Sequence, residues 1–199
     1  MILIGMLDSP FVRRVAIALK VVGLPFEHRS VSVFRHFDTF AAVNPVVKAP
    51  TLVAEDGTVL MDSTLILQHV ADLAGPGSRL VAQDIAQRTR DLRLTGLALA
   101  ACEKSVQIYY ERALRPPEKA HEPWLARVRG QLAAAYDALE AETGGLGEAA
   151  TQAAIDVAVA WRFTRHMVPD ALDPEPYPRL AAHSAVMEAT PAFASTPLD

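Results

Sequence analysis

The first 80 or so residues alternate between short apolar runs and amphipathic runs, which is typical of an α/β domain. Residues 1–6 are mostly apolar, as in a strand buried on both faces. Ser9-Pro10 is a typical helix start, and apolar side chains then recur every three or four residues until Gly23. Residues 26–31 read as a second strand. This strand–helix–strand order predicts a parallel pair of strands joined by a right-handed crossover.

The next part of the chain predicts a hairpin between two helices. A short helix is expected around residues 37–42, and an Asp-Gly turn joins strands at 51–54 and 59–61. Apolar positions then favour a helix from 62 to 74. The order β-α-β-α-β-β-α therefore predicts one mixed sheet that contains both a parallel pair and a hairpin.

From about residue 84 onward, the sequence predicts helices and no strand. Four alanine-rich stretches have helical character: 84–114, 123–142, 151–167 and about 177–188. The third stretch is apolar nearly all round, so we expect it to be the central helix. Residues 75–83 form the candidate linker, and residues 192–199 are expected to be coil.

Composition and charge narrow the functional classes. The 199 residues are 51% hydrophobic and 21% charged, as in ordinary globular proteins. A net charge of −4 argues against general nucleic-acid binding, which needs an excess of Lys and Arg. One cysteine, Cys102, cannot form an intramolecular disulfide, and this fits a reducing compartment. No apolar run reaches the roughly 18 residues of a membrane span. The first positive charges follow the N-terminal apolar run, so we expect a soluble, cytoplasmic protein without a secretory signal.

Common cofactor motifs are absent from the sequence. None of the six histidines belongs to a His-Glu-x-x-His or similar close pair, so no metal site is expected. The Gly-x-Gly-x-x-Gly and Walker patterns of nucleotide sites are missing, and so is the Gly-x-Ser-x-Gly elbow of hydrolases.

Ser9 is the first candidate for chemistry, because it joins the first strand to the first helix. The N–H groups and the positive dipole end of a helix favour an anion at this position. The Ser9 hydroxyl could donate to a bound thiolate, and such a charge-assisted bond contributes about 1.5–3 kcal/mol. That would lower a thiol pKa of about 8.5 by roughly one to two units. The alternative is that Ser9 only caps the helix.

Two other short motifs have binding chemistry. A cis peptide bond before Pro50 would present the backbone of Ala49 to an extended peptide, whereas an ordinary trans proline would not. Asp62 and Ser63 stand at a predicted helix start. Together they could bind an α-amino-acid group, with its carboxylate on Ser63 and the helix amides and its ammonium on Asp62. The alternative is again a helix cap.

These motifs together resemble the cytosolic glutathione S-transferase superfamily, and in particular a bacterial serine-type member. Ser-Pro follows the first strand, Asn-Pro-x-x-Lys-Ala-Pro-Thr-Leu precedes the third, and Asp-Ser follows the fourth. The resemblance implies a thioredoxin-like, glutathione-binding domain at 1–77 and an all-helical domain at 84–199 that contributes the hydrophobic substrate site. The family often has valine before the cis-proline and a Glu-Ser pair, where this chain has Ala49 and Asp62-Ser63.

The resemblance implies a glutathione site made of Ser9, Lys48, Ala49, Pro50, Asp62 and Ser63. Ser9 would donate to the glutathione sulfur, and the backbone of Ala49 would pair with the cysteinyl part. Asp62 and Ser63 would hold the γ-glutamyl end. Three side chains could bind the glycyl carboxylate as cations: Lys48, Arg35 and His36. Lys48 is our first choice. The electrophile would bind between the domains, against side chains among Tyr109, Tyr110, Arg112, Trp161 and His166, although core packing is the alternative for each.

The residue type at position 9 indicates the reaction class. Omega-like members have cysteine where this chain has Ser9-Pro10-Phe11, and serine cannot form a mixed disulfide. Cys102 is expected to serve packing. We therefore expect a homodimeric transferase that activates the glutathione thiol for attack on a small hydrophobic electrophile, as in detoxification, with glutathione as co-substrate and no metal. The alternatives are a glutathione-dependent isomerase or ether-cleaving enzyme, or a non-catalytic binding protein of the same fold.

Overall fold

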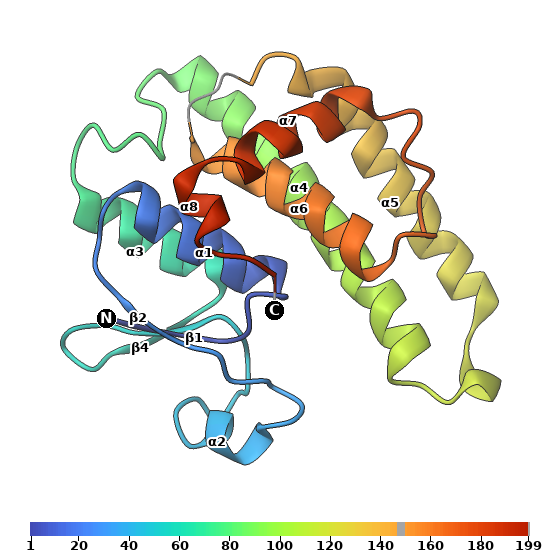
Figure 1. Ribbon diagram of the computed structural model, residues 1–199, viewed down its shortest axis with the longest axis horizontal. Helices are drawn as coiled ribbons and strands as arrows, with labels where there is room; N and C mark the ends of the chain where they lie inside the picture. The colour runs from blue at the N-terminus through green and yellow to red at the C-terminus, as the bar shows by residue number, and fades with distance from the viewer. Residues whose placement is uncertain (147–149, 199) are drawn as a thin grey trace. The chain divides into compact units, whose positions relative to one another are not determined.

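The computed structural model describes residues 1–146 and 150–198, which divide into two compact units (Figure 1). The first unit comprises Met1–Val81 together with the C-terminal segment that begins at Ala189. The second unit comprises Ala82–Glu188. Within the described residues, no helix combines the length and apolar composition needed to cross a lipid bilayer.

The first unit is built on a mixed sheet with the strand order β2-β1-β3-β4. Strand β1 (Ile2–Ile4) pairs in parallel with β2 (Glu27–Arg29) and antiparallel with β3 (Thr51–Val53). Strand β4 (Val59–Met61) pairs antiparallel with β3. The predicted parallel pair and hairpin are therefore confirmed in one four-stranded sheet.

Helix α1 packs against both the sheet and a second long helix of the first unit. It spans Pro10–Val21 and contacts β1 and α3, which spans Ser63–Ala74. Its predicted apolar face is buried, with Val12, Val15, Ala16 and Leu19 in the core. The short helix α2 (Phe37–Ala41) lies between β2 and β3 in the chain, where the sequence predicts it.

The second unit is helical throughout its described residues. Its long helices are α4 (Ile85–Ala113), α5 (Glu122–Thr143), α6 (Gln152–Met167) and α7 (Pro178–Glu188), with a short 3₁₀ turn at Pro117–Lys119. Helix α6 contacts both α4 and α7 and is buried from Ala153 to Trp161. It is therefore the central helix, as its all-round apolar pattern predicts.

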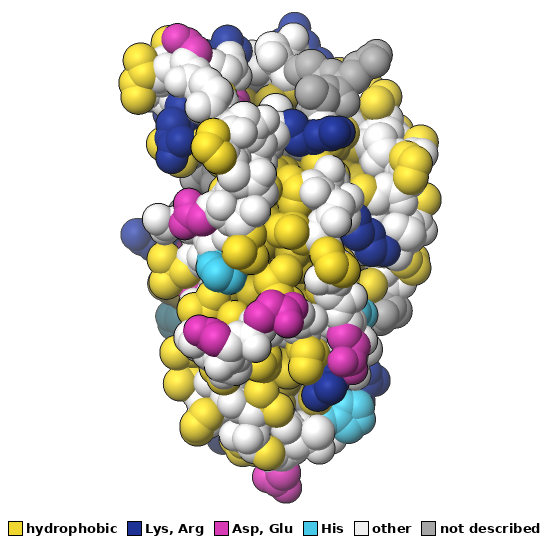
Figure 2. Space-filling model, turned by 90° about the vertical axis from the view of Figure 1, so that its left-hand side faces the viewer, with side chains coloured by type: hydrophobic (Ala, Val, Ile, Leu, Met, Phe, Trp, Pro, Cys, Tyr) yellow, Lys and Arg dark blue, Asp and Glu magenta, His cyan; other side chains and the backbone are white. Residues whose placement is uncertain are grey.

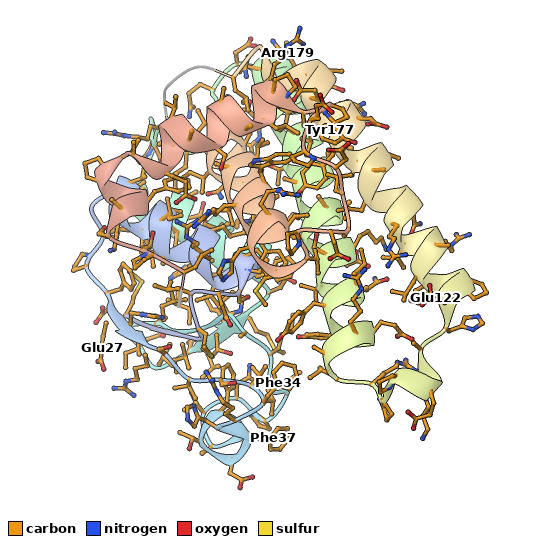
Figure 3. The ribbon with its side chains drawn as sticks, turned by 45° about the vertical axis from the view of Figure 1, so that its right-hand side comes forward. Glu27, Phe34, Phe37, Glu122, Tyr177 and Arg179 are labelled. Carbon is orange, nitrogen blue, oxygen red and sulfur yellow. The ribbon has the colours of Figure 1, made fainter. Side chains whose placement is uncertain are left out.

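A buried network of hydroxyl groups ties α5 to α6 and α4. The Tyr136 hydroxyl donates to the Ala160 carbonyl at 2.9 Å and lies 2.6 Å from the Thr164 hydroxyl. Thr164 in turn lies 2.7 Å from the Ser105 hydroxyl. Burial raises the pKa of Tyr136 well above its usual value, so its hydroxyl remains a neutral donor. The neighbouring Tyr177 lies next to α5 (Figure 3) and donates to Asp137 at 2.9 Å.

The C-terminal segment folds onto α1 and contains a short helix, α8 (Pro191–Ala194). Phe193 is 1% exposed, and the Arg13 guanidinium carbon lies 5.4 Å from the centre of its ring. Arg13 Nε also donates to the Thr196 carbonyl at 2.8 Å. The prediction of coil for residues 192–199 is therefore wrong at this helix. Its contacts come from α1, which is distant in sequence, so local pattern could not indicate them.

His183 on α7 should make the stability of the second unit depend on pH. Its Nε2–H donates to the Ala154 carbonyl at 2.9 Å, and burial lowers the pKa of His183 below the usual 6.5. The unfolded chain therefore takes up a proton first, and stability should fall as the pH drops from about 6.5 toward the folded pKa. His183→Gln keeps a donor but cannot titrate. Urea unfolding at several pH values should show a smaller decline for this variant than for the wild type.

Candidate functional site

The sheet brings the three predicted motifs to the same end of the first unit. Ile4, the last residue of β1, is paired with Thr51, which is in turn paired with Met61, the last residue of β4. Ser9 follows β1, Ala49-Pro50 directly precedes β3, and Asp62-Ser63 directly follows β4. Segments as far apart in the chain as Ser9 and Asp62 therefore leave the sheet side by side.

The Ser9 hydroxyl is available for a ligand. Ser9 is the N-cap residue of α1, yet its side chain makes no capping hydrogen bond. Its backbone carbonyl accepts from Val12 at 3.1 Å and from Arg13 at 2.9 Å, and Pro10 has no N–H to satisfy. Among the described residues the half-buried hydroxyl has no partner. The Ser9 side chain therefore does not cap this helix, unlike in the alternative interpretation of the sequence.

The loop before β3 is fixed by two buried polar side chains. The Asn44 amide donates to the Thr51 hydroxyl at 2.8 Å, and Thr51 donates to the Lys48 carbonyl at 2.8 Å. The Ala49–Pro50 peptide bond is cis, as the resemblance implies. Within residues 1–146 and 150–198, neither backbone polar group of Ala49 has a hydrogen-bond partner. The loop thus presents an N–H and a C=O to a ligand.

Asp62 both caps α3 and lies near a cation. Its Oδ1 accepts from the Thr64 N–H at 2.9 Å, so the predicted cap is present. Its Oδ2 lies 3.8 Å from Lys48 Nζ, and both side chains are about half exposed. Ser63 is buried, and its hydroxyl oxygen accepts from the Arg14 guanidinium at 3.0 Å. Asp62 can therefore use one oxygen for the helix and the other for a charged partner.

The other two candidate cations, Arg35 and His36, lie directly before α2, and each has a partner within the first unit. Arg35 Nη2 lies 3.3 Å from the Met6 sulfur, and His36 Nδ1 accepts from the Ser32 N–H at 3.3 Å. Phe34 and Phe37, in the same segment, are exposed on the surface of the first unit (Figure 3). Lys48 is the one among the three cations that the structure places beside Asp62.

The side chains that are candidates for binding the hydrophobic substrate lie in the second unit, and they differ in how far they are exposed. The Tyr109 and Tyr110 rings are 6.1 Å apart on α4, and Tyr110 is 42% exposed. Arg112 pairs with Asp170 at 2.8 Å and lowers the pKa of that carboxyl through the hydrogen bond. Trp161 is 6% exposed and packs edge-on against Tyr136, so the structure places it in the core rather than on a surface wall.

The described residues contain no group of three His, Cys, Asp or Glu side chains arranged to hold a metal ion. Cys102 is buried. The end of the sheet in the first unit brings together hydroxyl, carboxylate, ammonium and backbone groups, which suit a charged peptide ligand.

Comparison with known proteins gives the same family for both units. A family model described as "Glutathione S-transferase, N-terminal domain" matches residues 3–78, and "Glutathione S-transferase, C-terminal domain" matches residues 122–185. The uncharacterized GST-like protein YibF of Escherichia coli (strain K12) is 29% identical over 138 residues, which cover 69% of this chain and 67% of YibF. Glutathione S-transferase U6 of Arabidopsis thaliana is 28% identical over 64% of this chain, which spans 55% of that protein.

A crystal structure that matches the whole chain contains a ligand. It is a glutathione transferase family member from Pseudomonas fluorescens Pf-5 with bound glutathione, 30% identical in sequence. The match covers 100% of this chain and 98% of that one, with a TM-score of 0.89. The sheet topology, the cis bond at Pro50 and both family matches agree, and the chain belongs to the glutathione S-transferase family.

Proposed function

We propose that this protein is a glutathione transferase that ionises the glutathione thiol and directs it at a hydrophobic electrophile. The observation that carries the proposal is the Ser9 hydroxyl at the start of α1, which has no hydrogen-bond partner within residues 1–146 and 150–198. It lies at the end of the sheet where Ala49 and Asp62 also lie. The structural relative with bound glutathione supports the choice of ligand.

The tripeptide would lie along this end of the sheet, with its sulfur at Ser9 and its γ-glutamyl end at Asp62 and Ser63. Ser9 donates to the sulfur, while the N–H and C=O of Ala49 pair with the cysteinyl backbone as an added strand would. Asp62 takes the γ-glutamyl ammonium, and Ser63 takes the adjacent carboxylate. Lys48, whose side chain is about half exposed, can turn from Asp62 to the glycyl carboxylate.

The chemistry needs no group beyond those named. The thiol loses its proton to solvent, and the thiolate is stabilised by the Ser9 O–H and by the positive end of α1. The sulfur then forms a C–S bond with the electrophilic carbon, and a leaving group departs with the electrons of its bond. Ser9 keeps its own proton throughout, so it acts as a hydrogen-bond donor and not as a nucleophile.

We assign glutathione binding to residues 1–77 and the hydrophobic substrate to the helical region from residue 84. Tyr109 and Tyr110 offer aromatic surface on α4, and the ion pair with Asp170 holds the Arg112 side chain. These side chains favour an apolar acceptor with a planar group.

We further infer a cytoplasmic homodimer. Figure 2 shows hydrophobic side chains on the surface of the molecule. Strand β4 and helix α3 of the first unit both expose side chains of this kind. They include Val59, Met61, Leu65 and Leu73. Exposed apolar surface is often covered by a partner protein, so we expect these side chains to contribute to an interface between two copies of the chain. Sedimentation of the purified protein should therefore give the mass of two chains.

The deciding experiment combines binding with catalysis. Titration calorimetry should show glutathione binding, and the ultraviolet absorbance of the bound thiolate should give a pKa about one to two units below the free value of about 8.5. A panel of electrophiles should react only when glutathione is present. Binding with an unshifted thiol pKa would instead favour a non-catalytic binding protein. Turnover without net consumption of glutathione would favour an isomerase.

Asp62→Ala should weaken glutathione binding by about tenfold, because a buried or partly buried charge-assisted hydrogen bond contributes about 1.5–3 kcal/mol. Asp56→Ala is a matched control. Asp56 accepts from the Thr58 N–H at 2.9 Å just as Asp62 accepts from Thr64, but it lies in the hairpin turn. Titration calorimetry should show a loss for Asp62→Ala alone, and equal losses in both variants would contradict the assigned contact.

A further inference from the structure

Gly5 is the first residue after β1, and both α1 and the loop before β3 pack closely against it. A Cβ atom at this position would lie 2.6 Å from Val12 Cγ2 and 3.2 Å from Ala49 Cβ. Its φ is +138°, in the region that favours glycine. Gly5 therefore allows the helix that begins after Ser9 and the segment that presents Ala49 to meet at the end of β1.

Strand β2 binds both backbone polar groups of Gly5. The Gly5 N–H donates to the Arg29 carbonyl at 3.0 Å. The Gly5 carbonyl lies 2.8 Å from Nε2 of His28, a partly buried side chain on β2. A carbonyl can only accept, so His28 Nε2 must be the donor. In the described part of the chain no other group donates to this carbonyl, and glycine itself restricts the peptide orientation little, so His28 holds the Gly5–Met6 peptide in place.

The backbone links this peptide to Ser9 through a single turn. Met6 follows Gly5 directly, and the Met6 carbonyl accepts from the Ser9 N–H at 3.2 Å. A rotation of the Gly5–Met6 peptide would therefore move the Met6 carbonyl and, with it, the Ser9 backbone. The Ser9 hydroxyl makes no capping hydrogen bond, so its position depends on that backbone. The hydrogen bond from His28 thus determines where the Ser9 hydroxyl lies.

We propose that His28 is a positioning residue for thiol activation, which acts through the Gly5 carbonyl to direct the Ser9 hydroxyl at the sulfur. This inference rests on the proposed function, in which Ser9 donates to the glutathione thiolate. The Gly5 N–H keeps its own partner on Arg29 when His28 is replaced. The contact between Gly5 and Ala49, and with it the pairing of the tripeptide backbone, therefore does not depend on His28.

The test compares thiol ionisation with peptide binding in His28→Leu, which lacks the donor. The pKa of bound glutathione, measured from the ultraviolet absorbance of its thiolate, should rise by about half a unit to one unit. This shift is smaller than that expected for Ser9→Ala, because a displaced hydrogen bond is weakened and not removed. S-methylglutathione has no thiol to ionise, so titration calorimetry should show that its affinity changes by less than about twofold.

A double variant shows whether His28 acts through Ser9. In Ser9→Ala no hydroxyl remains to be displaced, so the further change His28→Leu should raise the thiol pKa no more. His28→Gln retains a side-chain N–H donor and should keep most of the wild-type lowering of the thiol pKa. If His28→Leu does not fold, His28→Asn takes its place, because the shorter amide stays polar but ends too close to the main chain to replace Nε2.

His183→Leu is the matched control, because His183 Nε2 also donates to a backbone carbonyl, that of Ala154 at 2.9 Å, but in the second unit. It can lower stability but should leave the thiol pKa unchanged. A folded His28→Leu with the wild-type thiol pKa would overturn the proposal, and so would an additive rise in the double variant. A wild type that binds no glutathione, or binds it with an unshifted thiol pKa, would instead refute the proposed function.

Discussion

Alanine in place of Ser9 should lower glutathione-dependent turnover by about ten- to a hundredfold near neutral pH. The hydroxyl contributes a charge-assisted hydrogen bond of about 1.5–3 kcal/mol to the thiolate, and one pKa unit corresponds to about 1.4 kcal/mol. The pKa of bound glutathione should therefore rise by roughly one to two units, which reduces the thiolate in proportion. Glutathione affinity should change little, since the carboxylate and ammonium contacts remain.

The pH profile distinguishes this role from a change in folding. In Ser9→Ala the rate should increase with pH until it approaches that of the wild type, because hydroxide ionises the thiol without help from the protein. Ser9→Thr keeps a hydroxyl group and should retain most of the activity. If Ser9→Ala turned over at the wild-type rate across the whole pH range, Ser9 would have no part in thiol activation.

Local pattern was sufficient to predict most elements of this fold. The helix stop at Gly23 and the Asp-Gly turn before β4 are local signals, which depend on only a few neighbouring residues. The helices and strands accordingly begin close to where they are expected. Helix α6 begins at such a signal, since the Thr151 hydroxyl accepts from the Ala154 N–H at 3.2 Å. Elements that depend on neighbouring residues are therefore readable from the sequence.

The site was only partly predictable, because some of its contacts join distant segments. Ser9 and Asp62 both stand at helix starts, and the sequence could not distinguish a cap from a free group. In the structure Asp62 caps its helix and Ser9 does not. Arg14 meets Ser63 across 49 residues of chain, and no local pattern marks this pair.

The loop before β3 illustrates the same limit. Asn44 belongs to the Asn-Pro motif that carries the family resemblance, but its spacing says nothing about its side chain. The structure shows the amide buried and bonded to Thr51, which holds the Lys48 carbonyl. Asn44, which in the sequence indicates only a turn, therefore also fixes the segment that presents Ala49.

Phe193→Ala should have the largest effect on stability, a loss of about 3–5 kcal/mol from the first unit. The ring is 1% exposed and lies under the Arg13 guanidinium, so the truncation removes a core aromatic and a cation–π contact together. Lys20 Nζ donates to the Ser195 carbonyl at 2.6 Å, and this contact remains in the variant. Since a domain is stable by only about 5–15 kcal/mol, the loss should be easy to measure.

The positions of the two tryptophans allow the stability of each unit to be measured separately. Trp124 and Trp161 both lie in the second unit, so their fluorescence during urea unfolding reports on that unit, whereas hydrogen exchange of α1 amides reports on the first. Phe193→Ala should accelerate exchange in α1 strongly. Phe37→Ala, at a position that is 55% exposed, should change it by less than about 0.5 kcal/mol. Equal α1 exchange in both variants would mean that the C-terminal segment does not stabilise the unit that contains Ser9.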